Sequence, residues 1–276
     1  MAFKSALSFR SSRQQEKPEP QEVYSLYGSV RRQTELLAAP LSAEDQMVQS
    51  CAEASPAKWH QAHTTWFFET FILSQRVRDY RPFDPRYRDL FNSYYNAVGA
   101  QPEKAVRNTF SRPTLEDVQA YRRHVDENMR GLLGEPLEDD LAKLIELGLN
   151  HEQQHQELLV TDIKHAFWSN PLRPAYQQAA QPAAAEVAAQ RAEAYAGGLV
   201  EIGAEDRAFH FDNEAPRHKT YVQPFRLARR PATCGEYLAF MDDRGYQRPE
   251  LWLSDGWLAV QTNHWNAPLY WEKQGT

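Results

Sequence analysis

Hydrophobic residues recur at helical spacing through the first 170 residues of the chain, and give way to short alternating runs after about residue 195. The helical spacing predicts helices over about 23–38, from Ser55 onward, from Thr114 onward and over about 137–167. Ser55 is a suitable N-cap with Pro56 at the first helical position, and Thr114 is a suitable N-cap for the third helix. Four such helices, with a long excursion between the second and third, predict a four-helix bundle.

The composition changes after residue 170. Ala, Gln and Pro dominate the segment 171–194, which is typical of a linker. The runs GLVEIGAE, HKTYVQPFRLA and YLAFMDDRGY follow and predict an irregular α+β domain. The expected organisation is therefore a tail over 1–22, a helical domain over 23–170, a linker over 171–194 and a second domain over 195–276. The tail is basic and Ser-rich, which fits a transit peptide or, as we expect, a disordered segment.

Composition and charge exclude several classes of function. The formal net charge of the 276 residues is −6, so the chain lacks the basic character of a nucleic-acid-binding protein. Its two cysteines, Cys51 and Cys234, are too few for a disulfide framework or a cysteine zinc ribbon, and they suit a reducing compartment. No apolar run approaches the roughly 20 residues that span a bilayer. We therefore expect a cytoplasmic protein with neither nucleic-acid nor membrane partners.

The fourth predicted helix places histidines where a bundle normally has apolar residues. Spacings of three and four put the following residues on one predicted inward stripe: Leu144, Gly148, His151, His155 and Leu158. A single inward histidine is usually a hydrogen-bonded core residue, whereas a pair one turn apart is an arrangement that builds metal sites in bundles. A further ligand is available on the second helix, where His60 and His63 both lie on the apolar side. The spacing alone does not choose between them.

The string HEQQH also matches the H-E-x-x-H signature of zinc peptidases. That hypothesis needs Glu152 as a general base and a third zinc ligand further along the chain. Leu158 and Thr161 stand where the extended metzincin motif has Gly and His, and the chain then enters a Pro/Ala/Gln segment. A peptidase is therefore disfavoured.

Longer strings resemble a known family. SPAKWHQAHTTWFFE, LFNSYYNAVG, SRPT and GLNHEQQHQELLVTDIKH resemble the DinB-like domain of the ergothioneine-biosynthesis sulfoxide synthases. GLVEIG, FHFDNEAPRHKTYVQPFRLA, GEYLAFMDDRGY and LSDGW resemble the start of the formylglycine-generating-enzyme-like domain, of C-type-lectin-like fold, that follows it in that family. The resemblance covers nearly the whole chain after about residue 24. It implies a DinB-like four-helix bundle followed by the first part of the second domain, with the chain ending part-way through that domain at Thr276.

The resemblance also implies a mononuclear non-haem iron(II) centre. The matching ligands are His63, His151 and His155, so the resemblance selects His63 over His60 and makes Fe(2+) the expected cofactor. Zinc would bind the same ligands but has no redox chemistry.

Further site residues follow from the same resemblance. It places Gln154 beside the substrate's imidazole, and Tyr94 and Tyr95 near the site, one of them as hydrogen-bond donor or proton source. Lys104 and Arg107 fall where basic residues would meet the carboxylate of the thiol substrate.

The implied activity is that of an oxidoreductase. O2 and a thiol, either cysteine or γ-glutamylcysteine, react with hercynine to form a sulfoxide at imidazole C2. The alternatives are an ovothiol-type or selenium-using sulfoxide synthase, or a non-catalytic DinB-type module that binds zinc or no metal.

Overall fold

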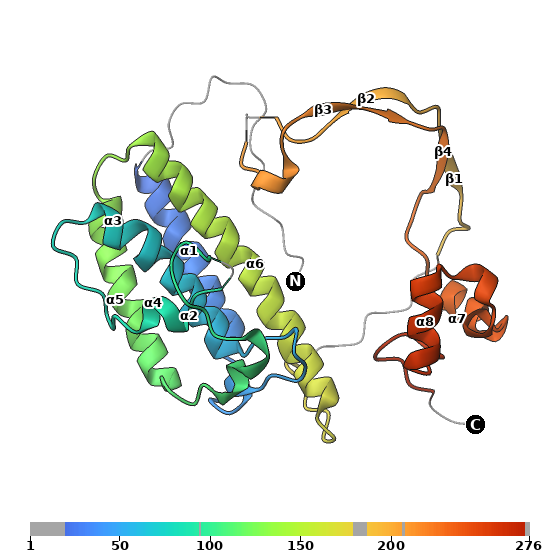
Figure 1. The fold of residues 1–276 in the computed structure, drawn as a ribbon, viewed down its shortest axis with the longest axis horizontal. Helices are drawn as coiled ribbons and strands as arrows, with labels where there is room; N and C mark the ends of the chain where they lie inside the picture. Colours follow the sequence, from blue (N-terminus) through green and yellow to red (C-terminus); the bar gives the residue numbers. More distant parts are fainter. Residues whose placement is uncertain (1–19, 94, 179–186, 206–207, 274–276) are drawn as a thin grey trace. The chain divides into compact units, whose positions relative to one another are not determined.

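The computed structural model describes residues 20–93, 95–178, 187–205 and 208–273 (Figure 1). The chain divides into two compact units, Met1–Ala179 and Ala180–Thr276. Most of the predicted N-terminal tail lies outside the described residues. Its expected boundary was too late, because the first helix already begins at Pro20.

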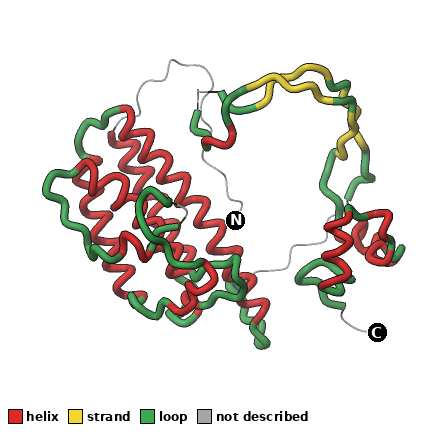
Figure 2. Tube along the Cα trace, in the orientation of Figure 1, coloured by secondary structure: helices red, strands yellow, loops and turns green. Residues whose placement is uncertain are grey.

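The described part of the first unit is helical, whereas the strands lie in the second unit (Figure 2). The elements of the first unit are α1 (Pro20–Ala38), η1 (Asp45–Met47), α2 (Ala57–Phe67), η2 (Phe68–Leu73), α3 (Ser74–Arg76), α4 (Tyr87–Leu90), η3 (Lys104–Thr109), α5 (Leu115–Leu133) and α6 (Asp139–Ser169). Helix α1 packs against α5 and α6, and α2 packs against the same two helices. The π-helical stretch η2 continues α2 without a break. Among the described residues no helix combines the length and the apolar character that crossing a membrane would require.

Of the two predicted helix N-caps, one is confirmed and the other is wrong. Thr114 caps α5: its side chain accepts a hydrogen bond from the backbone N–H of Asp117, whose carboxylate in turn accepts from the N–H of Thr114. Ser55 does not cap α2, which begins only at Ala57. The Ser55 hydroxyl instead accepts a hydrogen bond from Arg107, a residue far away in the sequence.

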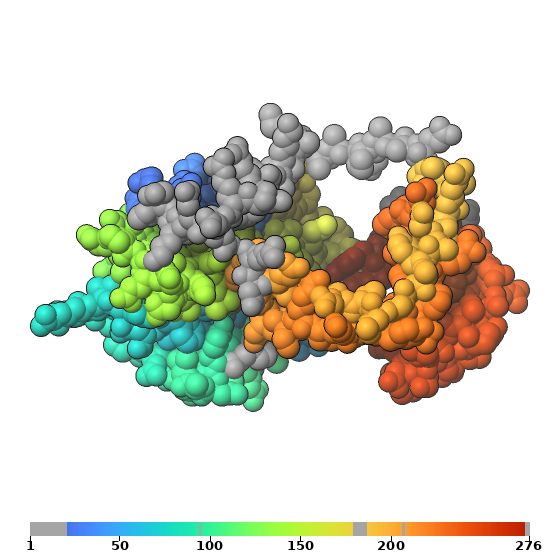
Figure 3. Space-filling model, turned by 90° about the horizontal axis from the view of Figure 1, so that it is seen from above, coloured from blue at the N-terminus to red at the C-terminus, as the bar shows by residue number. Residues whose placement is uncertain are grey.

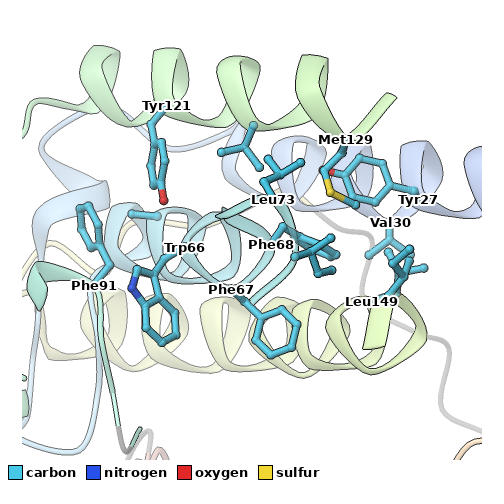
Figure 4. Close-up of a cluster of buried hydrophobic side chains, with 14 of the residues drawn as sticks. Tyr27, Val30, Trp66, Phe67, Phe68, Leu73, Phe91, Tyr121, Met129 and Leu149 are labelled. Atoms are coloured by element: carbon cyan, nitrogen blue, oxygen red, sulfur yellow. The ribbon is translucent and has the colours of Figure 1, made fainter. Parts of the chain in front are cut away.

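The core of the first unit forms where α2 and η2 lie between α5 and α6 (Figure 4). Trp66, Phe67 and Phe68 are at most 2% exposed, and burying each such side chain stabilises the fold by roughly 1.5–3 kcal/mol. Gly148 on α6 allows the helices to approach closely, since a Cβ at this position would lie 2.8 Å from the rings of both Phe67 and Phe68.

The predicted inward stripe of the last long helix was displaced by part of a turn. Leu158 is 45% exposed, and the two histidines of the stripe are only half-buried. The buried residues of α6 are Leu141, Ile145, Gly148, Leu149, Glu152, Leu159, Ile163 and Ala166. Because α1 and α2 both pack against α6, its buried face is centred on the line through Glu152. The histidines therefore lie at one edge of the buried face rather than at its centre.

The second unit contains two small antiparallel sheets. Its elements are β1 (Ala192–Tyr195), β2 (Gly198–Ile202), η4 (Asp212–Glu214), β3 (His218–Val222), β4 (Phe225–Ala228), α7 (Cys234–Asp242), η5 (Gly245–Gln247), η6 (Pro249–Leu251) and α8 (Ser254–Thr262). Strand β1 pairs with β4 and β2 with β3. Most strand side chains are exposed, and the yellow and orange strand segments lie at the surface in Figure 3. Strand β1 begins inside the predicted linker.

Candidate metal centre

Three histidines from two helices meet in the first unit. His63 comes from α2, and His151 and His155 come from successive turns of α6. One ring nitrogen of each lies within 4.8 Å of the corresponding nitrogens of the other two, and the ring centroids are 4.6–5.0 Å apart. The structure therefore brings together the three predicted ligands on a scale that one metal ion can bridge. Their role as iron ligands stays a prediction.

The tautomer of His63 follows from its surroundings. Its Nδ1 lies 2.7 Å from the carbonyl oxygen of Phe91, and because a carbonyl only accepts, Nδ1 carries the proton. Nε2 then keeps its lone pair and is available as a ligand. Trp59 and Trp66, one turn before and one turn after, stack on this imidazole at centroid distances of 4.5 and 5.3 Å and fix the plane of its ring.

His151 provides the test of whether a metal fits this site. Its Nδ1 is buried, and within the described parts of the chain it has no hydrogen-bond partner. A buried polar atom without a partner costs roughly 1–3 kcal/mol. In a cluster of three imidazoles a bound cation would provide the missing interaction, so the residues present fit a metal ion.

The three imidazoles are held neutral. Burial lowers the pKa of His151 to about 4, although the nearby Glu152 opposes this shift. Burial and the neighbouring histidines place the pKa values of His63 and His155 well below the ordinary range. Neutral imidazole is the form that binds metals, so the site is prepared for a cation at neutral pH.

Glu152 lies beside this cluster in sequence but on a different side of α6. It is fully buried, and its two oxygens accept hydrogen bonds from Arg31, Arg122 and Thr34. Burial raises its pKa, but the two arginines outweigh that effect and lower it to about 2. A carboxylate engaged in this way cannot act as the general base of a peptidase, and it serves the core of the unit instead.

The structure places the predicted aromatic residues as follows. Tyr94 lies outside the described residues. Tyr95 packs against Trp66 and Phe71 at centroid distances of 5.4 and 5.0 Å. Trp66 in turn stacks on His63, so Tyr95 is separated from the histidine cluster by one ring.

The predicted polar substrate residues differ in exposure. Gln154 is exposed on α6 and Lys104 is half-buried. Arg107 is buried: its guanidinium lies 3.4 Å from the centroid of the Trp59 ring and donates hydrogen bonds to Ser55 and Ser93. The structure thus links Arg107 to the cluster through Trp59.

The sequence did not predict that two polar residues, His60 and Asp162, lie together beside the cluster. His60 was considered only as an alternative ligand, but it is hydrogen-bonded to His155 and to Asp162. Asp162 was not singled out at all. Its position seven residues after His155, two turns along the same face of α6, was the available signal.

These features define a class of protein: a helical unit with a three-histidine cluster, followed by a smaller unit of short strands and helices. Residues 177–274 match the sulfatase-modifying factor enzyme 1-like domain. The chain is 27% identical over 226 residues to the hercynine oxygenase of Mycolicibacterium smegmatis, a match that covers 80% of this chain and 50% of that protein. It is 38% identical over 74 residues, 27% of this chain and 17% of the relative, to the hercynine oxygenase of Mycobacterium tuberculosis.

The chain spans about half the length of the Mycolicibacterium smegmatis relative. Together these matches confirm the resemblance to the ergothioneine-biosynthesis sulfoxide synthase family that the sequence motifs predict.

Proposed function

We propose that this protein is a non-haem iron(II)-dependent sulfoxide synthase that joins C2 of the hercynine imidazole to the sulfur of cysteine or γ-glutamylcysteine. The observation that carries the proposal is the cluster of three neutral imidazoles in a chain related to hercynine oxygenases. Helices α1, α2, α5 and α6 would form the DinB-like four-helix bundle of that family. His63, His151 and His155 would hold the iron.

Iron(II), when bound, would supply redox chemistry toward O2, which zinc lacks. The chain's own residues prepare the place for it. Nε2 of His63 carries a lone pair because Nδ1 is committed to Phe91. The indoles of Trp59 and Trp66 cover the His63 imidazole and shield it from water.

The proposed reaction balances with O2 as the only oxidant. The imidazole C2–H bond and the thiol S–H bond are broken, and a C–S bond forms. One oxygen atom of O2 becomes the sulfoxide oxygen, and the other leaves as water with the two released hydrogens. The thiol sulfur and the imidazole carbon are oxidised and O2 is reduced, so no external reductant is needed.

Substrate contacts are proposed from the positions of the predicted polar residues. Gln154, exposed and adjacent to His155, would hydrogen-bond the imidazole of hercynine. Lys104 would bind the carboxylate of the thiol substrate. Arg107 could bind the same carboxylate only if the carboxylate replaced one of its two serine hydrogen-bond partners, Ser55 or Ser93. Tyr94 or Tyr95 would donate a proton or hydrogen bond near the reacting sulfur. The pKa of Tyr95 is raised by burial, so its hydroxyl keeps its proton at neutral pH.

The test is a product assay by mass spectrometry. The purified chain is loaded with Fe(II) without air, mixed with hercynine, histidine, cysteine and γ-glutamylcysteine, and then exposed to O2. We expect a species with the mass of hercynine plus one thiol plus one oxygen minus two hydrogens. A product built on histidine would favour the ovothiol type. Stoichiometric iron without O2 consumption or product would contradict the proposal and favour a metal-binding module.

A further inference from the structure

His60 lies beside the histidine cluster and contacts one of its members. Its side chain is buried, and its Nδ1 lies 2.8 Å from Nδ1 of His155. Its Nε2 lies 3.1 Å from Oδ2 of Asp162, an oxygen that also accepts a hydrogen bond from the backbone N–H of Ser55 at 2.8 Å. Both ring nitrogens of His60 are therefore engaged, and neither is left for a metal ion.

The donor and acceptor properties of the groups determine where the protons lie in the hydrogen-bonded series Asp162, His60 and His155. A carboxylate oxygen that already faces the Ser55 N–H accepts, so Nε2 of His60 donates to it. Of the two Nδ1 atoms that face each other, one donates and the other accepts. If His155 binds a cation through Nε2, its proton is on Nδ1, and His60 must be the acceptor. The order Asp162, His60, His155 is then consistent at every atom.

We propose that His60 and Asp162 are positioning residues that hold His155 in its Nδ1–H tautomer and present Nε2 to the bound metal. The inference rests on the metal centre of the proposed function, and it adds two residues that orient one of the metal ligands through hydrogen bonds. Such partners fix the ring orientation and raise the basicity of the ligand, and losing them typically weakens metal affinity about 10–100-fold. His63 has the equivalent support from the carbonyl of Phe91.

The arrangement also connects the two helices that carry the ligands. His60 is one turn before His63 on α2, and Asp162 is two turns after His155 on α6. The hydrogen bonds from His60 to His155 and Asp162 therefore tie α2 to α6 at the cluster. A change at either residue is expected to loosen the ligand geometry without removing a ligand.

Cobalt(II) is a suitable probe, because its visible absorption reports coordination of the metal by the protein without the need for O2 or substrate. We would titrate the full chain and its His60→Phe and Asp162→Ala variants with Co(II) against a competing chelator. Both variants should bind about 10–100-fold more weakly. Asp162→Asn should retain most of the affinity, because the amide oxygen of Asn can still accept a hydrogen bond from His60. The opposite orientation of the amide is disfavoured, because it would place the NH2 group against the backbone N–H of Ser55. His165→Ala, a histidine of α6 bonded to Ser50, should leave the affinity unchanged.

Ring tautomers measured by nitrogen NMR on the metal-free chain separate positioning from general loss of structure. The His155 ring should be protonated at Nδ1 in the wild type and in Asp162→Asn, and this preference should be lost in Asp162→Ala. Wild-type affinity in a folded Asp162→Ala variant, or an Nε2–H tautomer of His155 in the wild type, would overturn the inference. If His60→Phe does not fold, the two Asp162 variants and the NMR decide.

The outcome is separable from that of the proposed function. A wild-type chain that binds cobalt with the expected variant pattern but forms no sulfoxide with iron would refute the synthase and leave the positioning role intact. Sulfoxide formation, together with equal cobalt affinity in the wild type and Asp162→Ala, would support the synthase and refute the positioning role. A wild-type chain that binds no cobalt would overturn the inference, because His155 would have no ion to face.

Discussion

His151 and Glu152 are neighbours in the chain but have different roles, and the difference comes from the faces of α6 on which they lie. His151 turns toward His63 and His155, whereas Glu152 turns into the core, where Arg31 and Arg122 neutralise it. The string HEQQH therefore combines two candidate metal ligands with a structural carboxylate. A pattern match cannot separate these roles, because the partners of Glu152 come from α1 and α5.

Replacing Glu152 tests the structural role. Glu152→Gln would leave the buried Arg122 without a carboxylate partner and Arg31 with Asp126 alone, so we expect the free energy of unfolding to fall by roughly 3–5 kcal/mol. Urea unfolding followed by circular dichroism measures it. The control Glu157→Gln, exposed on the same helix, should change stability by no more than about 0.5 kcal/mol. Equal stability of the two variants would contradict the role of the buried network.

Replacing His155 tests the metal site. His155→Ala removes one of three candidate ligands from a half-buried edge of α6, so stoichiometric binding of Co(II) or Fe(II) should be lost while the far-ultraviolet helix signal persists. The matched control is His124→Ala, which removes a histidine of α5 that packs on Tyr80 and Phe83. Normal metal binding by the His155 variant would show that the ligand assignment is wrong.

At the scale of elements, the cluster exists because α2 and α6 approach each other closely. Gly148 allows this approach, since its missing side chain leaves room for the rings of Phe67 and Phe68. The same contact fixes the distance between His63 on α2 and His151 on α6, one turn beyond the glycine. Packing of the core and geometry of the candidate site are thus set by one interface.

A pair of identical substitutions tests this interface. Gly131→Ala on α5 meets no atom within 4 Å and should stabilise the protein by about 0.5–1 kcal/mol through helix propensity. Gly148→Ala should instead destabilise it by roughly 1–3 kcal/mol, because a Cβ would crowd two buried phenyl rings. It should also weaken Co(II) binding. Thermal unfolding and cobalt titration measure both effects, and equal gains from the two substitutions would refute the close-packing argument.

At the scale of the whole molecule, the candidate metal ligands all belong to the first of two compact units. Ligand binding to the native state stabilises the part of the protein that must unfold to release the ligand. The match to the Mycolicibacterium smegmatis relative covers 50% of that protein.

Metal binding should therefore stabilise the two units unequally. Co(II) at about one hundred times its Kd should raise the stability of the first unit by roughly 2.7 kcal/mol. Hydrogen exchange followed by mass spectrometry should show slower exchange in α2 and α6 and unchanged exchange in α7 and α8, which serve as the internal control. A chelator should reverse the effect. Equal protection of both units, or none, would contradict a metal site confined to the first unit.

Local features of the protein were predictable from the sequence. The helical spacing located the long helices, and Thr114 caps α5 as expected because a capping box needs only residues three positions apart. The pair His151 and His155 is a feature of one helix, so its shared face follows from the helical period alone. The resemblance to the sulfoxide synthases then selected His63 from the two histidines of the second helix.

What only the tertiary structure decided depends on contacts between segments far apart in the chain. Local spacing could not show that the buried face of α6 is centred on Glu152, because that face is set by α1 and α2 together. It could not assign Ser55 to Arg107, nor place His60 between His155 and Asp162. The sequence by itself located the long helices and the candidate ligands. Their orientation and hydrogen-bond partners were decided by packing, because a side chain's role depends on what faces it from another helix.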